Sequence, residues 1–403
     1  MSTLESIVKI DDPLFYKDPY SIYARLRNED PVHYHKPLST WVLTKYDDIR
    51  NCARQPNIFS NSAGIFLTDA IGDSPVADDY FAESGELISS LDPPRHSELR
   101  RVLAPSFAPP VIDSMEDAIR GDCRDLLDDL EPDSSIDWIA SVAEVLPLVV
   151  TARLLGLPGD NISDLARWSD ELMKFGLVLS DEERAASIEA FSAMNEYMVD
   201  QLEAKRDNPG DDVLSVLLSA EIDKEYLSVA NILSLATAVL AGGNETTRAL
   251  LGNMVWAFAQ HPDQRQILAN DPSLASQAVE ETLRWKGPVH GFIRKVSKET
   301  ELRGKELETG HFIYMLFAAA NRDEEWFDEP ELFQITRKPD VPNLAFGSGN
   351  HQCPGMRLAR LEARILLEEL IQRFPSWKVT KEPRNIESLF RNGFYDLPVI
   401  FSR

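Results

Sequence analysis

Residues 346–355, Phe-Gly-Ser-Gly-Asn-His-Gln-Cys-Pro-Gly, constrain this chain more than any other segment. They place Cys353 behind a glycine-rich loop and directly ahead of a helical pattern over residues 356–374. Loop N–H groups and the positive end of the next helix both favour a thiolate there, and Pro354 suits a first helical position. Glycines also let a flat ligand approach the backbone closely. The segment therefore predicts a cysteine ligand rather than a structural cysteine beside a turn.

The segment resembles the haem-binding signature of the cytochrome P-450 family, Phe-Gly-x-Gly-x-His-x-Cys-x-Gly, with no mismatch. Cysteine thiolate is an axial ligand of haem iron and promotes cleavage of the O–O bond. The resemblance implies heme b (iron protoporphyrin IX) with Cys353 as the ligand of the metal. It also implies a mainly α fold with small β-sheets, formed as a single domain over residues 1–403, and a monooxygenase activity.

Hydrophobic periodicity agrees with a mainly helical chain. We expect a helix near residues 19–27, strands over 32–34 and 40–44, and a long irregular loop over 61–92. Residues 94–286 are mainly helical and include one long apolar helix over 227–260. Short strands over 293–317, a meander over 321–345 and a last strand near 397–401 complete the pattern.

Composition excludes several classes of protein. The net charge of −25 argues against nucleic-acid binding through a general positive field. The 3 cysteines lie far apart, which suits a reducing cytoplasm better than a disulfide framework. We see no signal peptide and no apolar run long enough for a membrane anchor. We therefore expect a cytoplasmic monomer.

Residues 241–247, Ala-Gly-Gly-Asn-Glu-Thr-Thr, fall inside the long helix and are expected to interrupt it. Each glycine costs about 1 kcal/mol relative to alanine, and Thr246 can bond the carbonyl four residues earlier. The segment resembles the acid–alcohol pair of the family. By that resemblance Glu245 feeds protons toward O₂ and Thr246 steadies the oxygen species, so both are predicted catalytic residues. Taken alone, the glycines also suit close helix packing and Glu245 a surface charge.

A buried porphyrin carries two propionates that need cationic or hydrogen-bonding partners. Residues 92–100 resemble the family pattern Asp-Pro-Pro-x-His-x-x-x-Arg, which implies that His96 and Arg100 bind propionates. The same resemblance implies that Arg294 and His351 also bind propionates. The alternative for each is an ordinary exposed base.

Glu281 and Arg284 match the Glu-x-x-Arg pattern of the family, with Arg337 as the candidate third member. This spacing is common on helices and means little alone. In the resembled fold it implies a buried structural ion pair that holds the meander behind the cysteine loop. Many relatives carry His where this chain has Asn343, which puts one meander contact in doubt.

The walls of a substrate pocket are predicted from position in the chain. The segments concerned are largely apolar, which favours a hydrophobic small-molecule substrate. The histidine among them is either a substrate contact or a satisfied core residue. The predicted wall residues are Phe66, Phe175, Leu240, Ala241, Asn244, Val289, His290 and Phe394.

No fused flavin or iron–sulfur segment is visible, so the resemblance implies a separate ferredoxin and an NAD(P)H-dependent ferredoxin reductase as partners. Arg357, Arg360, Arg364 and Arg373 follow Cys353 and form either a docking patch or pairs with Glu362, Glu368 and Glu369. A peroxide-driven peroxygenase is the first alternative function, against which the intact Glu245 and Thr246 argue. A haem gas sensor is the second, and a thiolate ligand suits it poorly.

Overall fold

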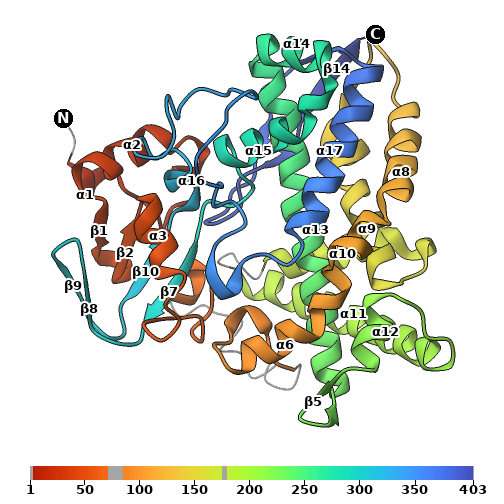
Figure 1. Cartoon of the computed structure of the whole chain (residues 1–403), viewed down its shortest axis with the longest axis horizontal. Coiled ribbons are helices and arrows are strands. Elements are labelled where there is room, and N and C mark those ends of the chain that lie inside the picture. The colour runs from red at the N-terminus through yellow and green to blue at the C-terminus, as the bar shows by residue number, and fades with distance from the viewer. Residues whose placement is uncertain (1–2, 71–84, 175–178, 403) are drawn as a thin grey trace.

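The computed structural model describes residues 3–70, 85–174 and 179–402. Most of these residues are helical, and the helices vary from single turns to the long α13 (Figure 1). The α-helices are α1 (Leu4–Ile7), α2 (Tyr20–Glu29), α3 (Tyr46–Cys52), α4 (Leu67–Ala70), α6 (Arg95–Leu103), α7 (Pro109–Asp113), α8 (Glu116–Asp128), α9 (Val145–Leu155), α10 (Ile162–Met173), α11 (Asp181–Asp207), α12 (Val213–Leu218), α13 (Val229–Gln260), α14 (Pro262–Asn270), α15 (Ala275–Trp285), α16 (Phe317–Ala320) and α17 (Met356–Arg373).

The strands are short and form small sheets. They are β1 (Val32–His35), β2 (Thr40–Leu43), β3 (Phe59–Ser60), β4 (Ser135–Asp137), β5 (Glu221–Ile222), β6 (Glu225–Tyr226), β7 (Phe292–Val296), β8 (Thr300–Leu302), β9 (Lys305–Leu307), β10 (Phe312–Met315), β11 (Ser376–Val379), β12 (Arg384–Asn385), β13 (Phe394–Asp396) and β14 (Pro398–Ser402). The largest sheet has the order β1-β2-β10-β7-β3, and its β2–β10 pair is parallel.

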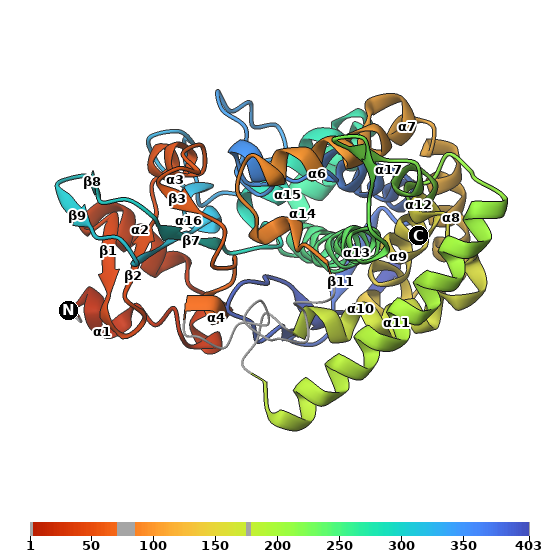
Figure 2. The same cartoon turned by 90° about the horizontal axis from the view of Figure 1, so that it is seen from below.

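The sheet and the helices occupy different sides of the molecule. In Figures 1 and 2 the largest sheet and the N-terminal helices lie on one side, and the long helices form the other. Helix α13 runs through the helical part and packs against α9, α10, α15 and α17. Strand β7 leads from the helical part into the sheet, so segments far apart in sequence meet where the two parts join.

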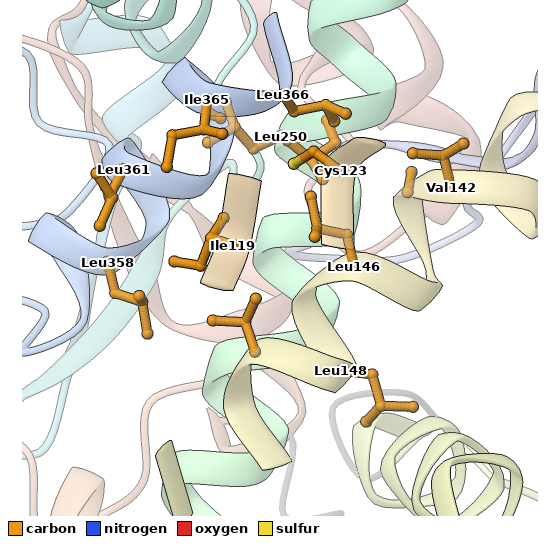
Figure 3. Close-up of a cluster of buried hydrophobic side chains, with 14 of the residues drawn as sticks. Ile119, Cys123, Val142, Leu146, Leu148, Leu250, Leu358, Leu361, Ile365 and Leu366 are labelled. Carbon is orange, nitrogen blue, oxygen red and sulfur yellow. The ribbon is translucent and has the colours of Figure 1, made fainter. Parts of the chain in front are cut away.

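The helical core is built from apolar faces at helical spacing. Figure 3 shows α8, α9, α13 and α17 contributing side chains to one buried cluster, which includes Cys123 as a small apolar residue. Burial raises the pKa of the Cys123 thiol well above its usual range, as expected for an inert core cysteine. The core therefore fixes α13 against α17, the two helices that flank the candidate site.

The prediction of a mainly α fold with small sheets is confirmed. The expected long helix is α13, the expected helix after Cys353 is α17, and the expected last strand is β14. The predicted interruption of the long helix is wrong, because α13 continues through Gly242 and Gly243 without a break. Pro354 precedes the first turn of α17 instead of entering it, since that helix begins at Met356. Among the described residues, no helix has the length and apolar character needed to cross a membrane.

Candidate active site

A cavity of about 330 Å³ is lined by α13, by the loop that contains Cys353 and by α17. Helix α13 contributes a face of small and polar residues that includes Gly242 and Thr246. Other parts of the wall come from α6, from β7 and β10, and from residues 288–289. The cavity therefore lies where the helical part meets the sheet.

The loop before α17 brings Cys353 to this cavity. The Cys353 N–H donates to the Phe346 carbonyl at 3.0 Å, which closes the loop. Gly349 has a φ of 74°, and a Cβ there would lie 2.2 Å from the Ala53 carbonyl oxygen, so only glycine fits. A larger residue at position 349 would therefore block the backbone path of the loop that carries Cys353.

Burial raises the pKa of the Cys353 thiol, while the backbone N–H groups of Gly355 and Met356 and the guanidinium of Arg100 act to lower it. The predicted arrangement of N–H groups around the sulfur is therefore present. A buried thiolate needs a positive partner, and a metal ion supplies one.

The structure brings His96, Arg100, Arg294 and His351 to this same cavity. The two imidazole rings lie 3.8 Å apart between centroids. Within the described residues, Arg100 and Arg294 bond backbone carbonyls, and neither forms a salt bridge. His96 Nδ1 and His351 Nε2 are buried without a hydrogen-bond partner. Among the described residues these four bases form no salt bridge, which suits a site for anionic groups.

Electrostatics lead to the same conclusion. Burial and the nearby Arg294 lower the pKa of His351 to about 3, and burial with Arg100 lowers that of His96. Burial also lowers the pKa of Arg294 to about 10, and Asp92 offsets part of that effect. Two carboxylates in the cavity would offset the cost of burying these charged bases. They would also supply hydrogen-bond partners for His96 Nδ1 and His351 Nε2. These residues, together with Cys353 on the same wall, fit a haem.

Thr246 faces the cavity from α13. Its Oγ1 donates to the Gly242 carbonyl at 2.8 Å, the bond expected from the sequence. Because that hydroxyl proton is already used, Thr246 can only accept a hydrogen bond from a group in the cavity.

The adjacent glycines have different roles. A Cβ on Gly243 would lie 2.6 Å from Thr151 Oγ1 on α9, so this glycine permits close helix packing. A Cβ on Gly242 would meet nothing within 4 Å, and this residue lines the cavity. One glycine therefore serves packing and the other leaves space beside Thr246.

Glu245 does not line the cavity, although Thr246 does. Its side chain is 2% exposed and contacts Arg248 at 3.1 Å and Arg391 at 2.9 Å. Burial acts to raise the pKa of Glu245, but Arg248 and Arg391 outweigh it and lower the pKa. Glu245 is therefore a buried carboxylate in an ion-pair cluster, not a surface charge.

Glu281, Arg284 and Arg337 come together behind the cysteine loop. Arg284 Nε lies 2.7 Å from Glu281 Oε2, and Arg337 Nε lies 3.2 Å from the same oxygen. Arg284 also donates to the carbonyls of Asn321 and Pro330 in the meander. Asn343, in place of the usual His, donates to Glu280 at 3.0 Å.

Most of the predicted substrate-wall residues are not in the described cavity wall. Of the eight residues, the described cavity wall contains only Val289, and Phe175 lies outside the described residues. Leu240, Ala241 and Asn244 point elsewhere because the cavity-facing residues of α13 recur at a different helical phase. Asn244 donates instead to Ser169 Oγ at 3.0 Å in the core.

The other three aromatic residues of that prediction are also used elsewhere. Phe66 packs on the Phe390 ring at 4.6 Å, and Phe394 packs on Trp256 at 5.7 Å. His290 lies in the core, where its Nδ1 bonds the Tyr23 hydroxyl at 3.3 Å and its Nε2 has no hydrogen-bond partner among the described residues. Burial lowers the pKa of His290 to about 3, so it is neutral.

Several wall residues were not predicted. Val239 and Leu250 share the face of Thr246, and the helical period of α13 carries that signal. Met315 reaches the cavity from β10, where strand alternation alone does not identify it. Arg391, the second partner of Glu245, had no local sequence signal.

The arginines of α17 are paired with acids. Arg357 pairs with Asp113, Arg360 with Glu280, and Arg364 with both Glu116 and Glu368. Arg373 pairs with Asp128 and Glu369.

Glu362 is not one of these partners, contrary to the predicted pairing. It is 1% exposed and lines the cavity. Burial raises its pKa well above the usual range.

Comparison with known proteins agrees with this site. The cytochrome P-450 family model matches residues 171–395. The chain is 33% identical to cytochrome P-450 107B1 of Saccharopolyspora erythraea over 398 residues, covering 96% of each chain. The chain belongs to the cytochrome P-450 family, and it is an oxidoreductase of the monooxygenase class. Membership implies a haem held by a cysteine thiolate.

Two further relatives extend the comparison. A methyl-branched lipid omega-hydroxylase of Mycobacterium tuberculosis is 33% identical, with 94% of this chain and 90% of that protein covered. The structure of a cytochrome P-450 from Chondromyces apiculatus superposes with a TM-score of 0.88 at 30% identity, covering 98% of this chain and 97% of that chain.

Proposed function

We propose that this protein inserts one oxygen atom from O₂ into a hydrophobic small molecule, by hydroxylation or epoxidation. Electrons come from a separate ferredoxin and its NAD(P)H-dependent reductase, and the protein works as a cytoplasmic monomer. The observation that carries the proposal is one cavity that contains Cys353, four bases that form no salt bridge within the described residues, and Thr246.

Each group in the cavity has a separate task. Bound heme b supplies oxygen activation, with Cys353 as its thiolate ligand. His96, Arg100, Arg294 and His351 hold its two propionates.

The distal residues handle hydrogen bonds and protons. Thr246 Oγ1 donates to the Gly242 carbonyl at 2.8 Å and keeps free lone pairs, so it accepts a hydrogen bond from a proton-carrying group in the cavity, such as water. Glu245 holds the proton that the reaction consumes and releases it toward the cavity.

The substrate is expected to be apolar. The cavity wall beyond the bases consists mainly of residues such as Val239, Val289, Phe292 and Met315. Such a wall selects by shape and burial of apolar surface. The lipid substrate in the name of the Mycobacterium tuberculosis relative agrees with this class.

A Thr246→Ala variant tests the assignment of the distal face. We expect it to bind haem and substrate like the wild type but to divert electrons from product to hydrogen peroxide. The measurement is product and peroxide formed per NAD(P)H consumed, with a screen of lipophilic compounds to find a substrate. Thr237→Ala on the same helix, outside the cavity wall, is the matched control. Full coupling in Thr246→Ala would contradict the role.

Cys353→Ser tests the ligand. The reduced, carbon-monoxide-treated variant is expected to lose the long-wavelength absorption that marks a thiolate-bound haem, which the wild type shows. Persistence of that absorption in the variant would refute Cys353 as the ligand.

A further inference from the structure

Three carboxyl groups and two guanidinium groups meet on a side of α13 that does not line the cavity. Arg248 Nη1 lies 3.1 Å from Glu245, 3.2 Å from Asp170 and 3.5 Å from Glu144. Arg391 Nη1 lies 2.9 Å from the second oxygen of Glu245. The groups come from α13, from α10, from the residue that precedes α9, and from the loop before β13.

The charges balance only when one of the three acids keeps its proton. Burial and a hydrogen bond with Glu245 raise the pKa of Asp170 to about 7, with smaller opposing and supporting effects from Arg248 and Glu144. The pKa of Glu245 is lowered by Arg248 and Arg391 despite its burial. Asp170 is therefore the protonated member near neutral pH, and its O–H donates to the Glu245 carboxylate.

The two members of this carboxyl pair differ in access to solvent. The Glu245 side chain is 2% exposed, whereas that of Asp170 is 44% exposed. Each oxygen of Glu245 also accepts a hydrogen bond from a guanidinium group. Any proton that reaches Glu245 from this side passes through a group that contacts both it and solvent. Asp170 meets that requirement.

The carboxyl pair is held in place by a neighbouring contact. Asn244 Nδ2 donates to Ser169 Oγ at 3.0 Å, and both residues are fully buried. These residues directly precede Glu245 and Asp170 in their helices, so the bond fixes α10 against α13 beside the two carboxyls. The contact is thus built into the packing of the helices rather than made by two mobile surface chains.

We propose that Asp170 is the outer member of a two-carboxyl proton path, taking protons from solvent and passing them to Glu245. The proposal rests on the proton-delivering role given to Glu245 in the proposed function. Asp170 acts through Glu245 and does not touch the reacting atoms, so it is a positioning residue.

The proton transfer balances within the cluster. The O–H bond of Asp170 breaks as an O–H bond forms on Glu245, and Asp170 becomes a carboxylate paired with Arg248. Glu245 then releases that proton toward the cavity and returns to its carboxylate form. Asp170 regains a proton from solvent water, which restores the starting charge.

The test compares Asp170→Asn with three proteins: the wild type, Asp170→Glu and Asp164→Asn. Asp164 is a matched control because it lies on the same helix, is 49% exposed and pairs with Arg167 at 3.0 Å. The first readout is the infrared band of protonated carboxyl groups, recorded on the resting protein against pH. We expect a component that titrates near pH 7 in the wild type and in Asp164→Asn, and that is missing from Asp170→Asn.

The second readout is turnover in H₂O and in D₂O. We expect Asp170→Asn to slow product formation by at least about tenfold and to enlarge the solvent isotope effect, since proton transfer becomes limiting. Asp170→Glu restores most of the rate, because it keeps a carboxyl beside Glu245. Asp164→Asn behaves like the wild type.

Three results would overturn the proposal: an infrared component that survives in Asp170→Asn, an unchanged rate and isotope effect in that variant, or a loss that Asp170→Glu does not restore. The last would assign Asp170 a purely structural role. Failure of the proposed function is distinguishable, because the wild type would then form no product from O₂ and any lipophilic compound.

Discussion

Replacing Glu281 by Gln tests whether the buried ion triad holds the cysteine loop. The Glu281 side chain is 3% exposed and accepts hydrogen bonds from Arg284, Arg337 and the backbone N–H of Gln334. The two arginine side chains are 2% and 8% exposed. The substitution leaves two buried guanidinium charges without their carboxylate.

Loss of one partner from a buried pair costs about 3–5 kcal/mol. Since each 1.4 kcal/mol is a factor of ten, that cost raises the population of an opened meander by roughly 10²–10⁴. The meander leads directly into the loop that presents Cys353. We therefore expect Glu281→Gln to unfold at a lower temperature and to be purified with little haem.

The neighbouring Glu280 provides a matched control. Its side chain is 42% exposed and pairs with Arg360, and a pair of that kind contributes about 0–1 kcal/mol. The assay is the haem-to-protein ratio after purification, followed by the thermal unfolding midpoint. Equal haem content and equal midpoints in Glu281→Gln and Glu280→Gln would refute the argument.

Two further predictions follow from individual contacts. Gly243→Ala places a methyl group against Thr151 and should lower the unfolding free energy by about 1–3 kcal/mol, whereas Gly242→Ala faces open space and should gain about 1 kcal/mol of helix propensity. Thermal unfolding compares the two, and shifts of the same sign would contradict the packing. Burial acts to raise the pKa of Glu369, but hydrogen bonds from three arginines outweigh it and lower the pKa to about 2. Because the folded pKa lies below the unfolded value, its contribution is present above pH 4.5 and is lost as the pH falls toward 2. The midpoint of Glu369→Gln should therefore lie below that of the wild type at neutral pH and converge with it in acid; a pH-independent gap would contradict this.

The sequence identifies groups whose positions depend on local pattern. Cys353 and His351 lie in one short loop, and the helical spacing of His96 and Arg100 puts both on one face of α6. Arg294 was identified by resemblance, and β7 carries it to the same cavity. Helix bounds were predicted to within a few residues where apolar periodicity is strong and a proline follows, as at the end of α13.

Helical phase explains why the three predicted wall residues of α13 are not in the described cavity wall. Once Thr246 faces the cavity, the residues three and four positions earlier must face it as well, and these are Gly243 and Gly242. Leu240 and Asn244 belong to another face of the helix. Counted from Thr246, the period of 3.6 residues per turn therefore places Leu240 and Asn244 off the cavity-facing side of α13.

Contacts between residues far apart in the sequence could not be predicted from local pattern. Arg391 reaches Glu245 from 146 positions away, and Asp170 reaches Arg248 from 78 positions away. Nothing within either segment predicts the contact, because it depends on how α10 and the loop before β13 pack on α13.

Adjacent positions on an α-helix point about 100° apart, so the edge of the cavity-facing side of α13 can fall between Glu245 and Thr246. It does fall there, because the wall contains Gly242, Gly243, Thr246 and Thr247 whereas Glu245 lies in the ion-pair cluster. Thr246 donates a hydrogen bond to the Gly242 carbonyl and keeps its proton, so it is not the source of the protons that the reaction consumes. The acid cannot draw on bulk water directly either, since it is 2% exposed. A proton on this route therefore has to enter through a third group, which is why the exposed oxygen of Asp170 matters for a reaction in a cavity it does not touch.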